Sequence, residues 1–409
     1  MRCLDAVVAV LVLLTPGSAN AASIAMTYEQ TLDRVAHVAP DLVAARAAEA
    51  VTGTESAIAG LLPNPSVSAG TSSQTAKLSV GLSVPLLVLG QRATAIEAGK
   101  SELAVTRVET ELAAADVRAL AAHAFVALWH AQSNAAERDR ADALSRRLEE
   151  AVSGRVDLGA APEMDGLRAR AEHLRASAEA QQATLLVAAA GSDLSRWLDL
   201  TEGDVVVPRG DPTVPAAPPP LTDLRSRLDE SPPLRRERAA ARAADARADH
   251  ERALVRPSLI VDAAIDVWDP TLCPGAPCSN PPVNYRGGVT VDLPILNQRG
   301  PYIDRELAMA AAARSREAAE RARLIAGLTS GYRTFEAWTA SARALGSGAV
   351  PAADAAAAAT EESYALGRAT LVALLDAERA RIDARLALLD ARTQQADAWI
   401  EVEHVLGTR

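Results

Sequence analysis

Apolar and polar residues alternate with a period of two in four short runs of this chain. In the second run, serine and glycine alternate with four aliphatic residues, Leu78, Val80, Leu82 and Val84. The third run, 259–268, places Asp262 and Asp266 on its polar side, and the fourth, 288–293, places Asp292 there. A weaker first run precedes them. Alternation of this kind predicts half-buried strands with one apolar and one polar face.

The remainder of the chain is predicted to be helical. Residues 93–154 contain no proline, and at about 1.5 Å per residue a helix of that length would be on the order of 90 Å long. Further helices are predicted over 28–60, over 221–254, and over two C-terminal partners of the long helices, about 162–200 and a final helix ending near Val405. Gly346, Gly348 and Pro351 interrupt only the second half, so one helix is expected to break there.

Three landmarks recur at nearly one spacing, which indicates an internal duplication. The pairs are 209, 209 and 208 residues apart: Pro85 and Pro294, Trp129 and Trp338, and Gly159 and Gly367. The predicted organisation is a first repeat over 22–207, a proline-rich linker over 208–220 and a second repeat over 221–409. Each repeat contains a helix, a β-hairpin (about 64–86 and 257–295) and long helices.

The N-terminus, residues 1–21, is typical of a cleaved export signal. An early arginine, a short apolar run, a Pro-Gly break and a small-residue site follow one another, and the run is too short to span a bilayer. No later segment has 18 continuous apolar residues, so no transmembrane helix is predicted. The strands could still cross a membrane.

Composition narrows the range of functions. The chain is 49% hydrophobic but only 3% aromatic, and much of the apolar share is alanine, which suits long, closely packed helices. A formal net charge of −10 gives no support for a nucleic-acid partner. No catalytic or cofactor motif is found, so neither an enzyme nor a cofactor is predicted. His123 and His130, near Phe125 and Trp129, are assigned to helix packing rather than to metal ligation.

Four strands cannot close a transmembrane barrel, since the smallest bacterial ones have about eight. An open sheet edge in lipid would leave backbone groups without partners. If these strands span a membrane, several chains must therefore share the barrel, and three chains would supply twelve strands. The alternative is a pair of hairpins that pack on helices in a soluble protein.

Five segments carry a resemblance to a known family. They are LLPNPSVSAG, SVPLLVLGQRATAIEAG, VDLPILNQRGPYIDRELAMAAAA, GRVDLGAAPEMDGLRARAE and SYALGRATLVALLDAERAR. In this order, the set resembles the TolC-like outer-membrane efflux proteins, and within them the CzcC-like branch associated with heavy-metal cation export. The resemblance covers almost the whole mature chain.

The resemblance implies a mainly α fold with a small β part, in a homotrimer. Duplicated long-helix hairpins would form a periplasmic α-barrel, and four strands per chain would form a shared 12-stranded outer-membrane β-barrel, with Pro85 at the bend between them. The protein would be a passive exit duct for metal cations, working with a periplasmic adaptor and an inner-membrane pump. Two alternatives stay open: a drug or polypeptide duct of the same fold, and a soluble periplasmic coiled-coil adaptor or scaffold.

The same resemblance suggests where function lies. It implies adaptor-docking tips at the two helix turns, with the matching residues Arg155, Leu158, Gly159, Leu366 and Gly367, although an ordinary turn would also use these residues. Asp165 and Asp376 are expected to line an aperture, as rings of carboxylate that favour cations, or else to be solvated helix residues. Asp262, Asp266 and Asp292 are expected in the barrel lumen. An intraloop disulfide is expected between Cys273 and Cys278, because the protein is exported and a Pro-Gly turn lies between them.

Overall fold

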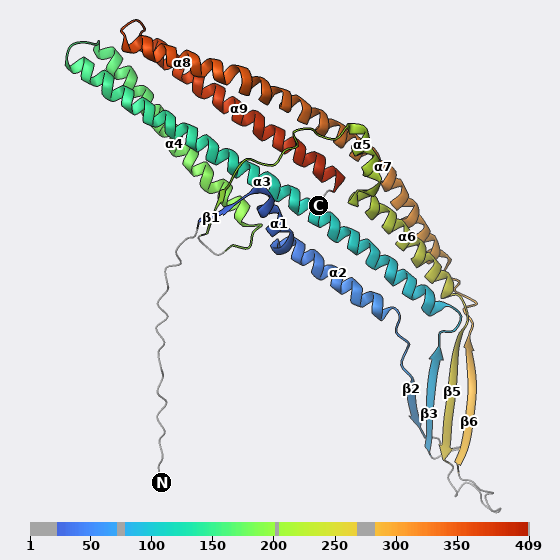
Figure 1. Ribbon diagram of the computed structural model, residues 1–409. Coiled ribbons are helices and arrows are strands. Elements are labelled where there is room, and N and C mark those ends of the chain that lie inside the picture. The colour runs from blue at the N-terminus through green and yellow to red at the C-terminus, as the bar shows by residue number, and fades with distance from the viewer. Residues whose placement is uncertain (1–22, 72–77, 201–203, 268–282, 408–409) are drawn as a thin grey trace, which may run out of the picture.

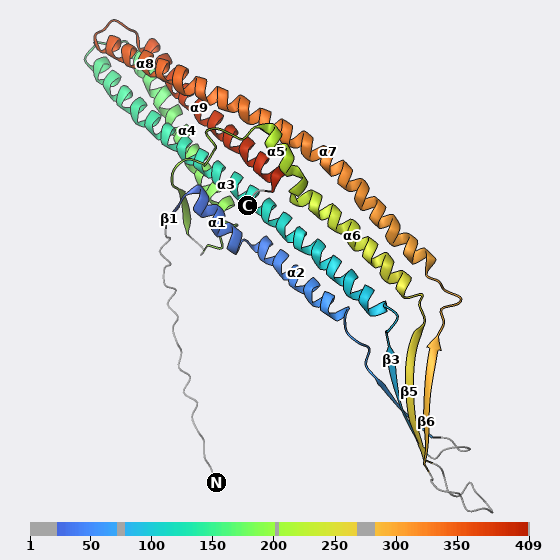
Figure 2. The same ribbon diagram turned by 45° about the vertical axis from the view of Figure 1, so that its right-hand side comes forward.

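The computed structural model describes residues 23–71, 78–200, 204–267 and 283–407 of a long, curved molecule. Four strands lie side by side at one end, and the helices run from them to two helix-to-helix turns at the opposite end (Figure 1). The rotated view shows the same arrangement (Figure 2). The expected combination of long helices with a small β part is confirmed.

The first half of the chain contains two short helices before its strands and two long ones after them. Their bounds are α1 (Tyr28–Val38), α2 (Pro40–Ile58), α3 (Gln91–Asp157) and α4 (Glu163–Ser195). α3 is one uninterrupted helix of 67 residues, roughly 100 Å long at about 1.5 Å per residue. It packs against α1, α2, α4, α6 and α9, so it is the central element of the helical part.

The second half repeats this order with more interruptions. It contains α5 (Leu221–Arg227), a 3₁₀ turn (Leu228–Glu230), α6 (Pro232–Ala253), α7 (Gly300–Ala344), a π-turn (Leu345–Ala349), α8 (Val350–Ala365) and α9 (Leu371–Leu406). The residues predicted as a linker, 208–220, contain only the last residue of a strand and irregular structure.

Two helices that the sequence pattern joins are split in the structure. Ala39 is extended (φ −56°, ψ 126°) between α1 and α2, and Ser231 is extended (φ −64°, ψ 141°) before α6. Both residues precede a proline, whose ring disfavours the helical conformation of the residue before it. The prediction of single helices over 28–60 and 221–254 was therefore wrong, although Pro40 and Pro232 carried the signal.

The predicted helix break at Gly346–Gly348 was also wrong. α7 passes through the π-turn and continues directly as α8. Pro351 lies in the first turn of α8, and the Ser347 hydroxyl donates to the Arg343 carbonyl at 2.7 Å. A π-turn absorbs extra residues without ending a helix, so the glycines bulge the helix instead of breaking it.

The two long helices that follow the strands begin in the same unusual way. Gly90 (φ 93°) precedes α3 and Arg299 (φ 56°) precedes α7, and these residues are 209 apart, the spacing of the other landmarks. Pro85 does not make the bend, because it lies inside a strand and pairs with Ile260. The change of direction occurs five residues later, at the left-handed residue.

The four strands form one antiparallel sheet. The strands are β2 (Ser66–Gly70), β3 (Leu78–Leu86), β5 (Ser258–Val267) and β6 (Val283–Asp292), in the order β2-β3-β5-β6. β3 and β5, one from each half of the chain, pair along nine residues. A second, two-stranded parallel sheet, β1 (Ser23–Met26) with β4 (Val205–Pro208), was not predicted, although the run Val205–Val207 was a signal for it.

The largest buried cluster lies where α1 crosses α3, beside α4, α9 and β4. Phe125 is fully buried, and its ring contacts Tyr28 edge to face at a centroid distance of 5.5 Å. His123 lies two residues before Phe125, about 200° around the helix. The face of α3 that carries His123 and His130 is therefore not the face that packs on α1.

Candidate functional site

One face of the sheet carries the three acids that the sequence predicts for a lumen. Asp266 lies level with Ser79 on the neighbouring strand, and the Ser79 hydroxyl donates to its carboxylate at 2.6 Å. On the other side, Arg286 Nε lies 2.6 Å from Asp266 Oδ2. The carboxylate is thus held by both flanking strands, and Arg286, which sequence reasoning missed, offsets its charge.

The other two acids follow the same rule on the same face. Asp262 accepts hydrogen bonds from the hydroxyl of Ser83 and, at 3.1 Å, from that of Thr290. Asp292 accepts one from the Ser258 hydroxyl at 3.2 Å. A polar strip therefore crosses β3, β5 and β6. Its place in a barrel lumen stays a prediction.

The opposite face of the sheet is apolar and exposed. By register it is formed by aliphatic residues and one tyrosine, of which those exposed beyond a third of their area include Val67, Val80, Leu82, Val261, Ile265, Tyr285, Val289 and Val291. β2 and β6 are the outer strands, so each presents one unpaired edge among the described residues. Such a sheet is stable only where the apolar face meets an apolar medium and the edges find partners.

The two helix turns at the far end of the molecule have the same backbone. Gly159 and Gly367 adopt φ of 71° and 70°. In the first turn the Gly159 amide donates to the Val156 carbonyl (2.8 Å) and the Ala160 amide to the Arg155 carbonyl (2.7 Å). The second turn repeats both bonds with corresponding residues. This is the Schellman arrangement, which needs a residue that tolerates positive φ.

The two turns differ in what they expose and are in contact with each other. Leu158 is 84% exposed and Leu366 is 59% exposed. The Arg155 guanidinium lies over the Tyr364 ring, 5.4 Å from its centroid, which links the two turns. The predicted tip residues are thus brought together at one end of the molecule. Two of them, Leu158 and Leu366, expose apolar side chains to solvent. Docking at this end is untested.

The predicted aperture acids lie just past these turns. Asp165 is in the first turn of α4 and is partly exposed, and Asp376 is in the second turn of α9 and exposed. Arg379 Nη1 lies 3.9 Å from Asp376 Oδ1. The Asp376 carboxylate is therefore partly offset by a neighbouring cation, a partner that sequence reasoning did not foresee.

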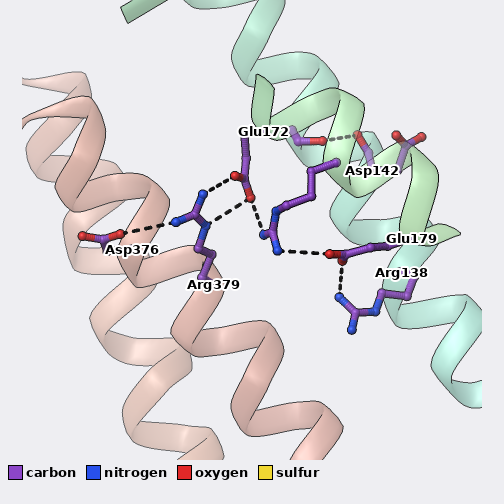
Figure 3. A network of polar contacts seen from close by, with 8 residues as sticks. Arg138, Asp142, Glu172, Glu179, Asp376 and Arg379 are labelled. Atoms are coloured by element: carbon purple, nitrogen blue, oxygen red, sulfur yellow. Dashed lines mark hydrogen bonds and ion pairs between the residues drawn. The ribbon is translucent and has the colours of Figure 1, made fainter. Parts of the chain in front are cut away.

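Arg379 belongs to a chain of ion pairs that joins α9 to α4 and α3 (Figure 3). Its Nε donates to Glu172 at 3.2 Å. Glu172 also accepts from Arg175 at 2.6 Å, and Arg175 donates to Glu179 at 3.0 Å. The chain ends with Arg138 of α3, which bonds Glu179. Burial raises the pKa of the Glu172 carboxyl, but hydrogen bonds from Arg379 and Arg175 outweigh it, so its pKa lies below the ordinary value.

His123 and His130 are partly buried where α3 meets α9, and both face carboxylates of α9. His123 Nδ1 lies 2.7 Å from Asp397 and Nε2 lies 3.2 Å from Glu401. His130 Nε2 lies 2.8 Å from Asp390. In the described part of the chain, no group of three or more histidine, cysteine or acidic side chains is arranged to hold a metal ion.

One described helix, α3, contains a window apolar enough to span a bilayer by length and composition. Half of that window is buried against the rest of the chain. The sequence analysis predicted no such helix, because it required 18 continuous apolar residues. Isolated charged residues interrupt the alanines of α3, so the helix did not meet that condition. Close packing of alanine against neighbouring helices accounts for the composition.

Two expectations from the sequence concern residues outside the described ranges. They are the export signal, 1–21, and the disulfide between Cys273 and Cys278. Both stay predictions.

Comparison with known proteins shows what this chain resembles in sequence and in fold. Residues 224–408 match the family model described as "Outer membrane efflux protein". The "Cobalt-zinc-cadmium resistance protein CzcC" of Cupriavidus metallidurans is 24% identical over 369 residues, with 88% of this chain and 85% of the relative covered.

Solved structures of low sequence identity share the fold. The outer membrane protein VceC from Vibrio cholerae superposes with a TM-score of 0.71 at 16% identity, covering 93% of this chain and 96% of that one. CusC superposes with a TM-score of 0.70 at 14% identity, covering 97% and 95%. Together with the family match on the second half of the chain, these likenesses show that the protein has the fold of outer-membrane channels and resembles outer membrane efflux proteins in sequence.

Proposed function

We propose that this channel is the outer-membrane exit duct of a tripartite efflux system and that three copies of the chain close its barrel. The observation that carries the trimer is the sheet. Among the described residues it has four strands, two unpaired edges and an exposed apolar face, and lipid tolerates no open edge. Pairing β6 of one chain with β2 of the next satisfies both edges and yields twelve strands in a trimer.

The oligomeric state tests this proposal directly. Protein extracted from outer-membrane fractions in mild detergent should have the mass of three chains by light scattering after subtraction of the detergent. Charged residues on the apolar face, as in Val80→Asp with Val261→Asp, should abolish membrane insertion, whereas Ser68→Asp on the polar face should not. A folded monomer that is stable without detergent would instead support the soluble scaffold.

Divalent metal cations are the proposed cargo. The support is the likeness to a protein whose name states cobalt, zinc and cadmium resistance, together with the acidic strip of the sheet. Deletion of the gene should sensitise the host to these metals and not to hydrophobic drugs. Sensitivity to drugs alone would leave the duct proposal intact and replace the cargo.

The tips are proposed as the surface that docks a periplasmic adaptor. Leu158 and Leu366 leave apolar area in water at the end farthest from the sheet, where a partner could bury it. Leu158→Asp with Leu366→Asp should abolish cross-linking to the adaptor and metal resistance while the trimer persists. Val43→Asp, at an exposed apolar position on α2, is the matched control and should leave both intact.

Asp165 and Asp376 are proposed to make the periplasmic end cation-selective. In planar bilayers, Asp165→Asn with Asp376→Asn should lower the preference for cations and the block by divalent cations, an effect screened by salt. Arg379→Gln, which removes the cation beside Asp376, should raise the preference. Unchanged selectivity in both variants would shift the assignment to Asp262, Asp266 and Asp292.

The duplication is proposed to define two structural repeats, 22–207 and 221–409, joined by 208–220. Corresponding left-handed residues support it, namely Gly90 with Arg299 and Gly159 with Gly367. Separately expressed repeats that reconstitute the channel when mixed would test these bounds.

A further inference from the structure

Three histidine–aspartate pairs connect α3 and α9 at regular intervals. His404 Nε2 lies 2.7 Å from Asp116, His123 Nδ1 lies 2.7 Å from Asp397, and His130 Nε2 lies 2.8 Å from Asp390. On each helix the three residues are seven apart, and the helices run antiparallel (Figure 1). We call these six residues the histidine seam.

The spacing makes the seam one continuous strip. Seven residues advance an α-helix by about 10.5 Å and rotate it by only about 20° from two full turns. Successive pairs therefore stay on the same side of both helices. Four of the chain's six histidines form ion pairs with carboxylates, and three of these four are in the seam.

The hydrogen bonds of His123 require a doubly protonated ring. A neutral imidazole has one N–H donor and one acceptor nitrogen. His123 faces a carboxylate with each nitrogen, Asp397 at 2.7 Å and Glu401 at 3.2 Å, and a carboxylate can only accept. Loss of one proton would therefore turn one of these contacts from attraction into repulsion between a lone pair and a carboxylate.

Other titratable groups around the seam come from the helices packed against it. Asp193 of α4 and Arg196, just after the end of α4, line the same hollow as His123 and His130. Beside His404, a small cavity is lined by Tyr28 of α1, Arg118 of α3 and Glu403 of α9, and burial raises the pKa of the Glu403 carboxyl. The hydrogen bond to Asp397 is the largest influence on the pKa of His123.

Beyond His130 the cation between α3 and α9 is an arginine instead of a histidine. One further step of seven residues reaches Glu137 on α3 and Asp383 on α9, both acids. Here Arg385 Nη1 of α9 lies 3.5 Å from Glu137. Arginine keeps its proton at every physiological pH, so this contact is the same at pH 5.5 and pH 8.0.

We propose that the histidine seam is a proton-dependent contact between the two repeats. It holds α9 against α3 at mildly acidic pH and weakens as the pH rises above neutrality. The inference concerns a conformational property of the duct and holds for any cargo. It needs no metal, because the two nitrogens of His123 face different carboxylates on opposite sides of the ring.

The direction of the pH effect follows from linkage. The hydrogen bond to Asp397 raises the pKa of His123 more than burial lowers it. A raised pKa means that the stabilisation is fully present below the unfolded value of about 6.5 and is lost as the pH rises through the folded value. Repulsion from neighbouring cations would shift the transition without changing its sign.

Hydrogen exchange of the full-length protein in detergent tests the proposal. Protection of α3 and α9 peptides around the seam is compared at pH 5.5 and pH 8.0, after correction for intrinsic exchange. A partly exposed pair such as His123 with Asp397 contributes a factor of about 1.4 to 5, so opening of the seam should lower protection by at least a factor in this range. Peptides of α6 and α7 serve as the internal reference and should not change.

Two sets of variants separate titration from simple loss of contact. His123→Gln, His130→Gln and His404→Gln together should give low protection at both pH values. The corresponding triple arginine variant keeps the ion pairs without titration and should stay protected at both. The control His250→Gln removes a histidine that faces the Thr94 hydroxyl at 3.2 Å and should behave as the parent. Equal pH dependence in the parent and the triple glutamine variant would overturn the proposal, as would a triple arginine variant that still loosens at pH 8.0.

Discussion

The interface between α6 and α7 is held by arginine, whereas the seam between α3 and α9 is held by histidine. In the arginine interface, Arg247 donates to Glu306 at 2.8 Å and Arg238 donates to Glu317 at 2.7 Å. Glu306 is only 2% exposed. The seam histidines lie nearer the surface, with His123 and His130 about a third exposed. Both interfaces join long helices through charged side chains, yet they differ in depth and in the cation used.

The difference sets opposite pH windows. In the arginine interface, burial raises the pKa of Glu306, but hydrogen bonds from Arg247 and Arg305 outweigh it, and the net pKa is lowered. Its stabilisation is present above the ordinary glutamate value of about 4.3 and is lost as the pH falls through the lowered value. The pair of His123 loses its stabilisation in the other direction, as the pH rises above about 6.5. The arginine interface, next to the four-stranded sheet, is thus constant across the range in which this pair changes.

The largest expected effect is on the arginine interface. Arg247→Met leaves the buried Glu306 with Arg305 as its remaining cation, so the free energy of unfolding should fall by about 1.5–3 kcal/mol. The fall should be equal at pH 5.5 and pH 8.0. Thermal unfolding followed by circular dichroism measures it. Arg252→Met, which removes an exposed pair on the same helix, is the control and should cost less than about 0.5 kcal/mol.

Replacing an arginine by histidine in another ion pair sharpens the comparison. Arg379→His puts a titratable cation against Glu172, so the link between α9 and α4 should weaken above neutral pH by about 1 kcal/mol and persist at pH 5.5. Arg379→Lys, which stays charged, should show no such pH dependence. A histidine variant that is equally unstable at both pH values would mean that the planar arginine geometry, and not the charge, holds this link.

Glu378 on α9 offers a change in the opposite direction. Burial raises the pKa of this carboxyl, and Glu361 adds to the effect against Arg381. Its ionised form is therefore disfavoured in the folded protein. Glu378→Gln should raise stability by up to about 1 kcal/mol at pH 7 and change it much less near pH 4, where the carboxyl is mostly protonated in both states. A melting series over pH 4–8 provides the measurement.

The smallest effect on stability is expected for a single histidine–aspartate pair of the histidine seam. His123→Gln should lower stability at pH 5.5 by about 0.2–1 kcal/mol, because the pair is partly exposed, and should change nothing at pH 8.5. The difference between the two pH values, measured on parent and variant side by side, isolates the titrating pair. A cost that is the same at both values would make the contribution of His123 one of packing.

The overall plan of the molecule was predictable because it depends on local periodicity. Alternation with period two marked β3, β5 and β6, and the proline-free stretch marked α3 as a single rod. Backbone rules located the turns at Gly159 and Gly367, since positive φ favours glycine. Two helix breaks were missed because the effect of a proline on the residue before it was overlooked at Pro40 and Pro232. The break predicted near Gly346 does not occur, because a π-turn lets the helix continue.

Of the candidate sites, the sequence located the residues but not their partners. Asp376 was located just past a turn, and Arg379 beside it lies three residues further on the same helix, so the i,i+3 spacing could have indicated this partner. The alternation of period two along the strand placed Asp266 on the polar face. Its contact with Arg286, by contrast, depends on the register between β5 and β6. His123 was assigned to packing because its neighbours in sequence are aromatic, although they face the other side of the helix.

What the sequence determined by itself is therefore the set of elements, their lengths and the face on which each side chain lies, because these follow from the 2.0 and 3.6 periods of the backbone. Only the tertiary structure decided which charges meet. The histidine seam joins residues more than 250 positions apart, and its regular rungs exist because α9 runs antiparallel to α3 in one register. A shift of either helix by a single turn would leave the same residues on the same faces and break every pair.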